Sequence, residues 1–562
     1  MEPSRRFSRR IHNAGPLLIP ALLASVFIAT IPIRAQQQPQ PTDNPSQGSY
    51  SIKTSVRRVV VDVVVTDAQG NSKRGLAAKD FSIEEDNQTQ RILSFDSHDK
   101  DSYPGVLPAN VPPNTFINLP REPEQGPLYI LLYDMVNTGD TNPIGADYSA
   151  NIFARQQLIK FVNGKPSGTR FALIVNSDGL HLVQGFTNDK QKLLTALDPN
   201  GKTPHMPKVF LYTSNYRPGD PYYILAVLKD IEQYVEGLPG RKNVIWASLH
   251  FPFALFPSNS PPDVIDPFRK QLTEMAANQI AIYPVSAGGS PIVAGGAERW
   301  TMDEIAAETG GFAYQSNDMA GDIERATERG DTYYTLSYTS TNKDYNGKLR
   351  HIEVKLSQQG YHLAYRHEYY ADPELPQLPT PPGAPKPKQI NIKDAPTDTL
   401  YAYLRFGAPM SHDLLFSAHV QPVGDPKLAT PEQMADLSDQ PAYFRKRHKD
   451  KPVDTRPPVP LQAYSIEYDI PSRQFRANPA TRDQPEDPIE FAAAAYTAEG
   501  VMLNGKIGNA SPKAEQTKYY PAQQEFEVPT NAARLCLAVR DPTTGRIGNL
   551  EINLPLQPDP TK

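Results

Sequence analysis

The residues best placed to bind a ligand are polar side chains that follow a short apolar run. Leu128–Tyr133 is an unbroken stretch of apolar and aromatic residues, and it ends at Asp134, with Asn137 and Thr138 close behind. Such a run, preceded by Gly-Pro and followed by polar residues, predicts a strand buried on both faces. Open parallel sheets bind ligands beyond the carboxyl ends of such strands. We therefore expect Asp134, Asn137 and Thr138 to lie at a binding site.

Catalytic motifs that can be recognised by spacing are absent from the sequence. It contains no Gly-x-Ser-x-Gly, no His-Glu-x-x-His and no Gly-x-x-x-x-Gly-Lys followed by Ser or Thr. The single cysteine, Cys536, lies in the apolar run Leu535–Val539 and is expected to be a buried small hydrophobe. We expect a binding protein and not an enzyme, although a catalytic group assembled from distant residues stays open as an alternative.

Strands and helices alternate along residues 126–330, which predicts an α/β domain with a doubly wound, mostly parallel sheet. Leu128–Tyr133 is expected in the middle of this sheet. Apolar residues at helical spacing predict the helices, and Asn317 is expected to cap the last of them. The other expected strands are Arg170–Val175, an edge strand at His181–Phe186, Asn243–Ala247, Ile280–Val285 and Phe312–Gln315.

Shorter β segments flank this domain. A small β unit is expected at 51–98, followed by a linker at 99–125. A β meander at 331–371 is expected to pack with 51–98, because neither is large enough to be stable alone. A proline-rich linker at 372–389 leads to 390–562, where seven runs predict a C-terminal β-sandwich. Those runs are Leu400–Phe406, Leu414–Val420, Leu461–Ile470, Ile489–Tyr496, Phe526–Val528, Leu535–Val539 and Leu550–Leu554.

The amino-terminal residues resemble a targeting segment. Several arginines precede the mostly apolar stretch Leu17–Ile33, and Ala35 followed by Gln36 is a plausible cleavage point. Residues 1–35 are therefore expected to be a signal peptide, and 36–50 a disordered spacer, so that the mature protein is secreted or periplasmic. The alternative is an uncleaved anchor, which would be the only link to a membrane. The net charge of −5 gives no indication of nucleic-acid binding.

The order of segments resembles that of secreted bacterial proteins related to the von Willebrand factor A domain, of the kind common among acidobacteria. The resemblance covers Val56–Ala371, and the combination of stretches is more specific than any one of them. The matching stretches are Val61–Asp67, Gly75–Glu85, Leu131–Thr138, Arg155–Phe161, Leu182–Asp189, Gly240–Trp246, Ile280–Val285, Thr309–Gly311, Tyr334–Tyr338 and Gly360–Tyr370.

The resemblance implies a binding domain whose sheet carries a metal-dependent adhesion site. In the family pattern, Mg²⁺ is held by an Asp, hydroxyls two and four residues later, a distant Thr and a distant Asp. Asp134 and Thr138 match this pattern, whereas Val136 has no oxygen, and Ser248 stands where the distant Asp is expected. We therefore expect a degenerate site, with Asp134, Asn137, Thr138 and Ser248 as binding residues.

Two interpretations of this site remain open. Mg²⁺ could bind through Asp134 and Thr138 if Asn137 or Asp140 replaces a missing ligand, and the distant Thr could be Thr203 or Thr213. Alternatively, Asp134 caps a loop or helix while the polar residues after it bond the backbone.

The leading functional hypothesis is an exported adhesion protein that binds a protein partner in the cell envelope or outside the cell. The alternatives are a periplasmic hydrolase that recruits substrate through the A-like domain, and an envelope scaffold.

Overall fold

The computed structural model describes residues 58–98, 111–119, 125–134, 146–165, 168–176, 180–197, 222–248, 251, 262–286, 296–371, 399–437, 457–471, 474, 489–510, 519–542 and 544–558. The expected signal peptide, the spacer at 36–50 and the proline-rich linker at 372–389 lie outside these residues. All the described residues belong to one compact unit. None of the helices within the described ranges is both long and apolar enough to cross a membrane.

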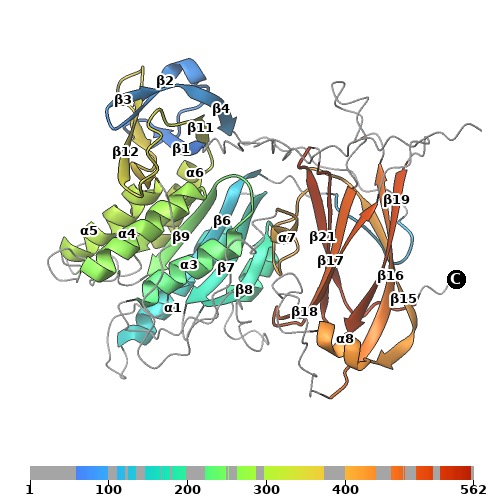
Figure 1. Cartoon of the computed structure of the whole chain (residues 1–562). Coiled ribbons are helices and arrows are strands. Elements are labelled where there is room, and N and C mark those ends of the chain that lie inside the picture. Colours follow the sequence, from blue (N-terminus) through green and yellow to red (C-terminus); the bar gives the residue numbers. More distant parts are fainter. Residues whose placement is uncertain are drawn as a thin grey trace, which may run out of the picture. The chain divides into compact units, whose positions relative to one another are not determined.

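The chain is an α/β protein with several sheets, as predicted. The central sheet has the strand order β10-β9-β6-β7-β8, so β6 (Gln125–Asp134) occupies its middle (Figure 1). Strands β7 (Thr169–Asn176), β9 (Lys242–Ser248) and β10 (Ile280–Ser286) run parallel to β6 in register. Strand β8 (Leu180–Thr187) pairs with β7 in the antiparallel direction and forms one edge. The uninterrupted apolar sequence of β6 fits this position, because neither of its faces meets water.

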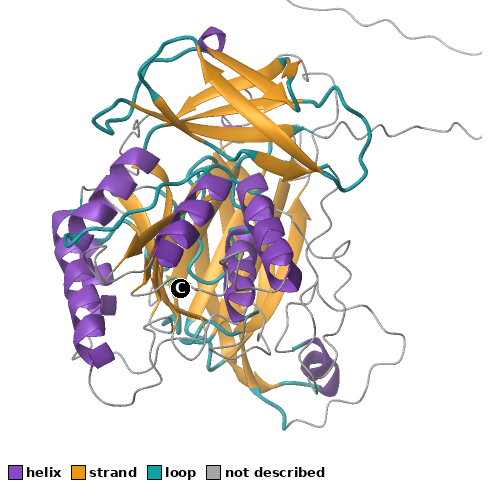
Figure 2. Ribbon diagram, turned by 90° about the vertical axis from the view of Figure 1, so that its left-hand side faces the viewer, coloured by secondary structure: helices purple, strands orange, loops and turns teal. Residues whose placement is uncertain are grey.

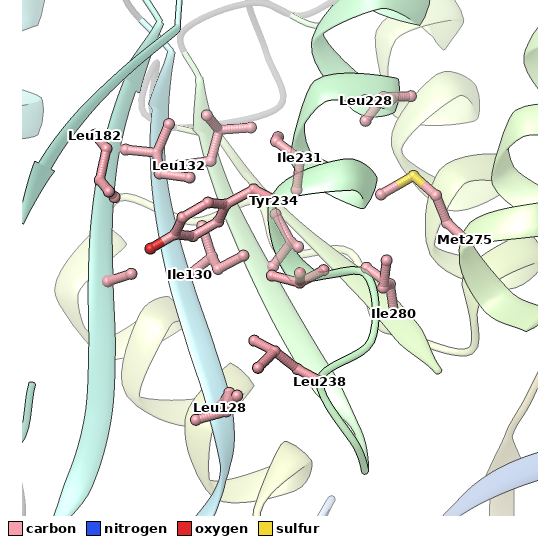
Figure 3. Packing of buried hydrophobic residues seen from close by; sticks show 14 of the residues in the cluster. Leu128, Ile130, Leu132, Leu182, Leu228, Ile231, Tyr234, Leu238, Met275 and Ile280 are labelled. Carbon is pink, nitrogen blue, oxygen red and sulfur yellow. The ribbon is translucent and has the colours of Figure 1, made fainter. Parts of the chain in front are cut away.

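Alternate residues of β6 face two separate hydrophobic cores. Leu128, Ile130 and Leu132 belong to a core shared with α3 (Tyr223–Val235), α4 (Pro262–Ala277) and α5 (Gly296–Thr309). Tyr129, Leu131 and Tyr133 face α1 (Ala146–Gly164), α2 (Lys190–Leu197) and α6 (Met319–Gly330). Figure 2 shows helices beside the strands of this sheet, and Figure 3 shows Tyr234 of α3 reaching across it toward Leu182. The sheet is therefore covered on both faces.

The amino-terminal β unit and residues 331–371 share their sheets. One sheet has the order β13-β1-β11-β4 and the other the order β14-β12-β2-β3, and the two enclose a common core. The early strands are β1 (Val59–Thr66), β2 (Phe81–Glu85), β3 (Gln88–Gln90) and β4 (Ile92–His98). The late strands are β11 (Tyr333–Tyr338), β12 (Leu349–Leu356), β13 (His362–Ala364) and β14 (Glu368–Tyr370). They do not form the expected meander, because β11 pairs with β1 and β4 whereas β12 pairs with β2 and β14.

Two four-stranded antiparallel sheets form the carboxyl-terminal region and share one core. The first, of order β19-β16-β15-β5, contains β5 (Thr115–Ile117), β15 (Ser417–Leu428), β16 (Pro460–Pro471) and β19 (Tyr519–Pro529). The second, of order β18-β17-β20-β21, contains β17 (Ile489–Tyr496), β18 (Met502–Ala510), β20 (Arg534–Arg540) and β21 (Ile547–Asn553). Two short helices, α7 (Thr399–Ala402) and α8 (Pro431–Asp436), accompany them.

Four expectations about individual segments need correction. Leu400–Phe406 is α7 and a following turn, not a strand, and its apolar residues join the core under α3. Phe312–Gln315 contributes only a bridge between Tyr314 and Val285. The side chain of Asp318, not Asn317, caps α6 by accepting from the Gly321 amide. Within the expected linker 99–125, Thr115–Ile117 forms β5 and pairs with β15.

Candidate functional site

A row of polar residues lies at the carboxyl ends of the four parallel strands. Asp134 of β6 is in register with Asn176 of β7 on one side and Ser248 of β9 on the other. Ser286 of β10 is in register with Ser248. Each of these residues directly follows an apolar stretch, and each is buried. We call these four residues the polar row; they mark the edge at which parallel sheets of this kind bind ligands.

The carboxylate of Asp134 is the centre of a buried hydrogen-bond network. Asp134 is only 1% exposed. Oδ1 accepts a hydrogen bond from Asn176 Nδ2 at 2.9 Å. Oδ2 accepts from Trp246 Nε1 at 3.0 Å and, more weakly, from Ser248 Oγ at 3.5 Å. These donors replace the water that a carboxylate loses on burial.

The network continues from Asn176 into α3. The hydroxyl of Tyr223 donates to Asn176 Oδ1, which leaves the amide of Asn176 free to donate to Asp134. Trp246 is held on its other side by Phe251, whose ring lies 5.3 Å away in an edge arrangement. The position of the Asp134 carboxylate is therefore fixed by side chains from β7, β9 and α3.

The described part of the site does not have the donor set that a hard divalent cation requires. Mg²⁺ prefers near-octahedral oxygen coordination and is commonly held through carboxylates. The polar row offers one carboxylate, both of whose oxygens already accept hydrogen bonds, beside one amide and two hydroxyls. Among the described residues there is no group of three His, Cys, Asp or Glu side chains that could hold a metal.

Two of the four residues expected at a binding site can be placed in the structure. Asp134 and Ser248 were both expected as binding residues, and the structure brings their side chains together. Asn137 and Thr138 lie outside the described residues, as do Asp140, Thr203 and Thr213.

Four residues of the polar row and its hydrogen-bond network were missed. Asn176 and Ser286 also follow apolar strands directly, so the reasoning applied to Asp134 would have found them. No comparable signal marks Trp246 or Tyr223, because both lie within apolar stretches.

A second buried polar cluster lies at the opposite ends of the strands and has a structural role. Arg241 Nη2 donates to Gly310 O at 2.7 Å, and Arg241 Nη1 lies 3.9 Å from Asp62 Oδ2 of β1. Thr335 and Gln279 also donate to the Asp62 carboxylate. Burial opposes the charge of Arg241, but Tyr283 and Asp62 outweigh it and raise its pKa.

The adjacent Lys242 belongs to the same cluster. Burial lowers its pKa to about 8, and its ammonium donates to Leu238 O at 2.9 Å. The contacts of Asp62 with Arg241 and Gln279 join β1 to the central sheet. Because this cluster has a structural role, the polar row is the better candidate for a binding site.

No family model and no curated protein matches the sequence. Similar solved structures include an aerotolerance-related membrane protein from Bacteroides fragilis NCTC 9343, with 11% identity over 36% of this chain and 98% of that chain, at a TM-score of 0.24. BatB from Bacteroides thetaiotaomicron gives 13% identity over 36% and 97% of the two chains, at a TM-score of 0.23. The von Willebrand factor domain of the pilus tip protein Mfa5 from Porphyromonas gingivalis gives 11% identity over 36% and 95%, at a TM-score of 0.24. Similarities this low support no functional conclusion, so the fold and the site rest on the strand order and contacts described above.

Proposed function

We propose that the chain is an exported binding protein that recognises a protein partner through the carboxyl edge of its central sheet. The observation that carries this proposal is the polar row, in which four parallel strands end in register on buried polar residues around the Asp134 carboxylate. In this proposal the central sheet is doubly wound and von Willebrand A-like, and the carboxyl-terminal sheets form a β-sandwich. Function is binding and not catalysis, and the partner lies in the cell envelope or outside the cell.

In the proposed mechanism the buried row positions a binding surface and does not itself touch the partner. Asp134 and Ser248 are too buried to contact a large molecule, since they are each 1% exposed. The residues that follow them in sequence, Asn137 and Thr138 above all, are proposed to make the contacts. The network around Asp134 would then set where the segment after β6 leaves the sheet.

Binding is proposed to be independent of a divalent metal. The family pattern would use Asp134 and Thr138 as ligands, but the Asp134 oxygens already accept hydrogen bonds from an amide, an indole and a hydroxyl. Recruiting them to Mg²⁺ would require those donors to lose their acceptor, at about 1–3 kcal/mol for each buried group left unpaired. Metal-independent binding is therefore favoured over binding through a Mg²⁺ ion held by an incomplete ligand set.

The test is capture of a partner from envelope extract by the full chain, in three forms: the natural sequence, an Asn137→Ala/Thr138→Ala double variant, and a Thr544→Ala control. Thr544 is an exposed residue in the turn before β21, and its hydroxyl hydrogen-bonds to Asp541 and Arg546 of the same turn, so its loss leaves the central sheet unchanged. We expect the same protein to be captured by the natural chain and the control, with and without a chelator, and to be lost from the double variant.

Two results would contradict the proposal in different ways. Retention of the partner by the double variant would place the binding surface elsewhere. Loss of the partner on chelation alone, reversed by added Mg²⁺, would restore a metal-dependent site. Capture is scored only for variants whose thermal unfolding matches that of the natural chain.

A further inference from the structure

A cavity of about 340 Å³ lies between α4, the beginning of β1 and the segment that includes β14. Its volume falls within the range of roughly 300–1,000 Å³ that is usual for small-molecule sites. It is separate from the polar row, which lies at the ends of β6, β7, β9 and β10. Two kinds of side chain give it chemical character: charged groups and tyrosine rings. These are Glu274, Arg366, Arg58, Tyr345, Tyr369 and Tyr370.

Arg366 is a buried arginine that makes no ion pair within 4.0 Å among the described residues, although the charges of Asp62 and Glu274 act on it from farther away. The other two buried arginines there have one: Arg350 lies 3.1 Å from Glu85, and Arg241 lies 3.9 Å from Asp62. Arg366 is 6% exposed and donates from Nη2 to Val60 O, but its Nε has no acceptor within the described part of the chain. A buried guanidinium normally has its donors paired, preferably with a carboxylate.

Glu274 lies on the same cavity and has the complementary deficiency. It is 7% exposed, and its Oε1 has no hydrogen-bond donor among the described side chains and backbone groups. Burial, and then the nearby Glu232, raise its pKa to about 7, although Lys270 and Arg366 oppose that change. Protonation alone would not satisfy the group, because a carboxylic acid in this place would still need a partner.

Tyrosine rings form the rest of the polar wall. The Arg366 guanidinium lies 5.8 Å from the centre of the Tyr369 ring, and Tyr345 and Tyr370 also line the space. Flat aromatic walls favour a flat aromatic occupant, since offset or edge contacts between rings add about 0.5–1.5 kcal/mol beyond area burial.

We propose that this cavity binds a small aromatic carboxylate that also carries a hydrogen-bond donor. The ligand carboxylate accepts from the Arg366 guanidinium, the donor group bonds to the Glu274 carboxylate, and the ring lies among the tyrosines. Because Arg366 Nε and Glu274 Oε1 have almost no surface open to the cavity, both side chains turn toward the ligand on binding. One such ligand would satisfy both unpaired buried groups at once. A ligand lacking either substituent would leave one of them unpaired, so the site should discriminate among closely similar molecules.

The test is calorimetric titration of the full chain with three probes of similar size. 4-Hydroxybenzoate has both groups, benzoate lacks the donor, and 4-hydroxybenzyl alcohol lacks the carboxylate. We expect saturable binding of 4-hydroxybenzoate and weaker binding of the other two, by about tenfold or more, which corresponds to about 1.4 kcal/mol for each tenfold change.

Two variants locate the site and assign the contact. Glu274→Met keeps the length of the side chain but removes its acceptor, so it should weaken 4-hydroxybenzoate by about tenfold and leave benzoate unchanged. Ala277→Phe places a ring at the exposed rim of the cavity and should abolish binding of all three probes. Glu324→Met is the matched control, because Glu324 is an exposed glutamate on α6. This variant should bind all three probes as the natural chain does.

Three results would overturn the proposal. The first is the absence of saturable binding by 4-hydroxybenzoate. The second is an equal loss of affinity for 4-hydroxybenzoate and benzoate in Glu274→Met, which would show that the glutamate does not bind the donor group. The third is unchanged binding in Ala277→Phe, which also decides the question if Glu274→Met fails to fold.

Discussion

Asp134 is the centre of the buried hydrogen-bond network at the strand ends. Its position after the apolar run of β6 agrees with that of a metal ligand in the von Willebrand A pattern. In the structure its two oxygens accept from Asn176, Trp246 and Ser248, and Tyr223 holds Asn176 in turn. Such a carboxylate stabilises the strand ends around it whether or not it binds anything, because removing it leaves buried donors without an acceptor.

Replacing Asp134 should therefore destabilise the fold in a graded way. Asp134→Ala leaves the buried amide of Asn176 and the indole of Trp246 unpaired, so we expect a loss of about 2–5 kcal/mol. Asp134→Asn keeps one acceptor oxygen and should lose less. Ser248→Ala removes only the weak 3.5 Å donor and should cost under about 1 kcal/mol.

Chemical denaturation followed by tryptophan fluorescence measures this series. Trp246 is one of only two tryptophans, so its emission should also change when its acceptor is removed. An equal cost for Ser248→Ala and Asp134→Ala would show that the network does not depend on the carboxylate.

Elements were predictable where one local property determined them. The buried strands β6, β7, β9 and β10 were found because each contains a mostly apolar run. The edge strand β8 was found as a short run in which polar residues interrupt the apolar ones. Leu400–Phe406 has the same apolar character but forms α7 and a turn, since it packs against α3 and not within a sheet. Its partners lie far away in sequence, so no local pattern could reveal its conformation.

The same limit explains β5 and the polar row. Thr115–Ile117 lies in a polar, proline-rich stretch and becomes a strand only because β15 offers it an edge. Asn176 and Ser286 become part of one site only when the register of four strands is known. Local sequence therefore predicted the four parallel strands, whereas the contents of the site depended on pairing between them.

The end of α5 is a tight contact that can be tested directly. Gly310 has φ +73°, and a Cβ on the next residue, Gly311, would lie 1.9 Å from the backbone oxygen of Ile282 in β10. We expect Gly311→Ala to force α5 away from β10 and to lower stability by about 2 kcal/mol or more.

Gly164→Ala is the matched control for Gly311→Ala. Gly164 is the last residue of α1, and a Cβ there would meet nothing within 4 Å. This change should be neutral or stabilising by up to about 1 kcal/mol. The thermal unfolding temperature should therefore fall for Gly311→Ala and stay the same or rise for Gly164→Ala. A similar loss in both would argue that helix-end glycines matter here only for chain flexibility.

On the scale of the whole molecule, segments far apart in sequence are interleaved. β11 lies between β1 and β4, so 59–98 cannot form its sheet without residues that follow the central domain. β5 precedes that domain in sequence but pairs with β15, which follows it. After α7, Gly407 O accepts from the Phe186 amide of β8 at 2.9 Å and from the Tyr234 hydroxyl at 3.1 Å. Linear domain boundaries therefore do not describe how these parts are held together.

This interleaving predicts that cutting the chain between Ala371 and Thr399 will not separate its halves. A protease site inserted in 372–398 and cleaved under native conditions should give two fragments that elute together in size-exclusion chromatography. β5 of the first fragment remains paired with β15 of the second, and the segment after α7 remains against β8 and α3.

Two of the contacts between the halves can be weakened by substitution, and a matched pair of glycine variants tests one of them. Phe116→Asp places a charge where β5 meets the carboxyl-terminal core, and Gly407→Ala brings a Cβ within 2.8 Å of Gly185 Cα. Together they should weaken the association of the cut halves, although apolar residues of α7, β17 and β20 still pack in the core under α3. Gly424→Ala in place of Gly407→Ala has a comparable positive φ but no neighbour within 4 Å, so it should keep the halves together. Separation of the cut but otherwise natural protein would mean that neither contact holds the two halves in solution.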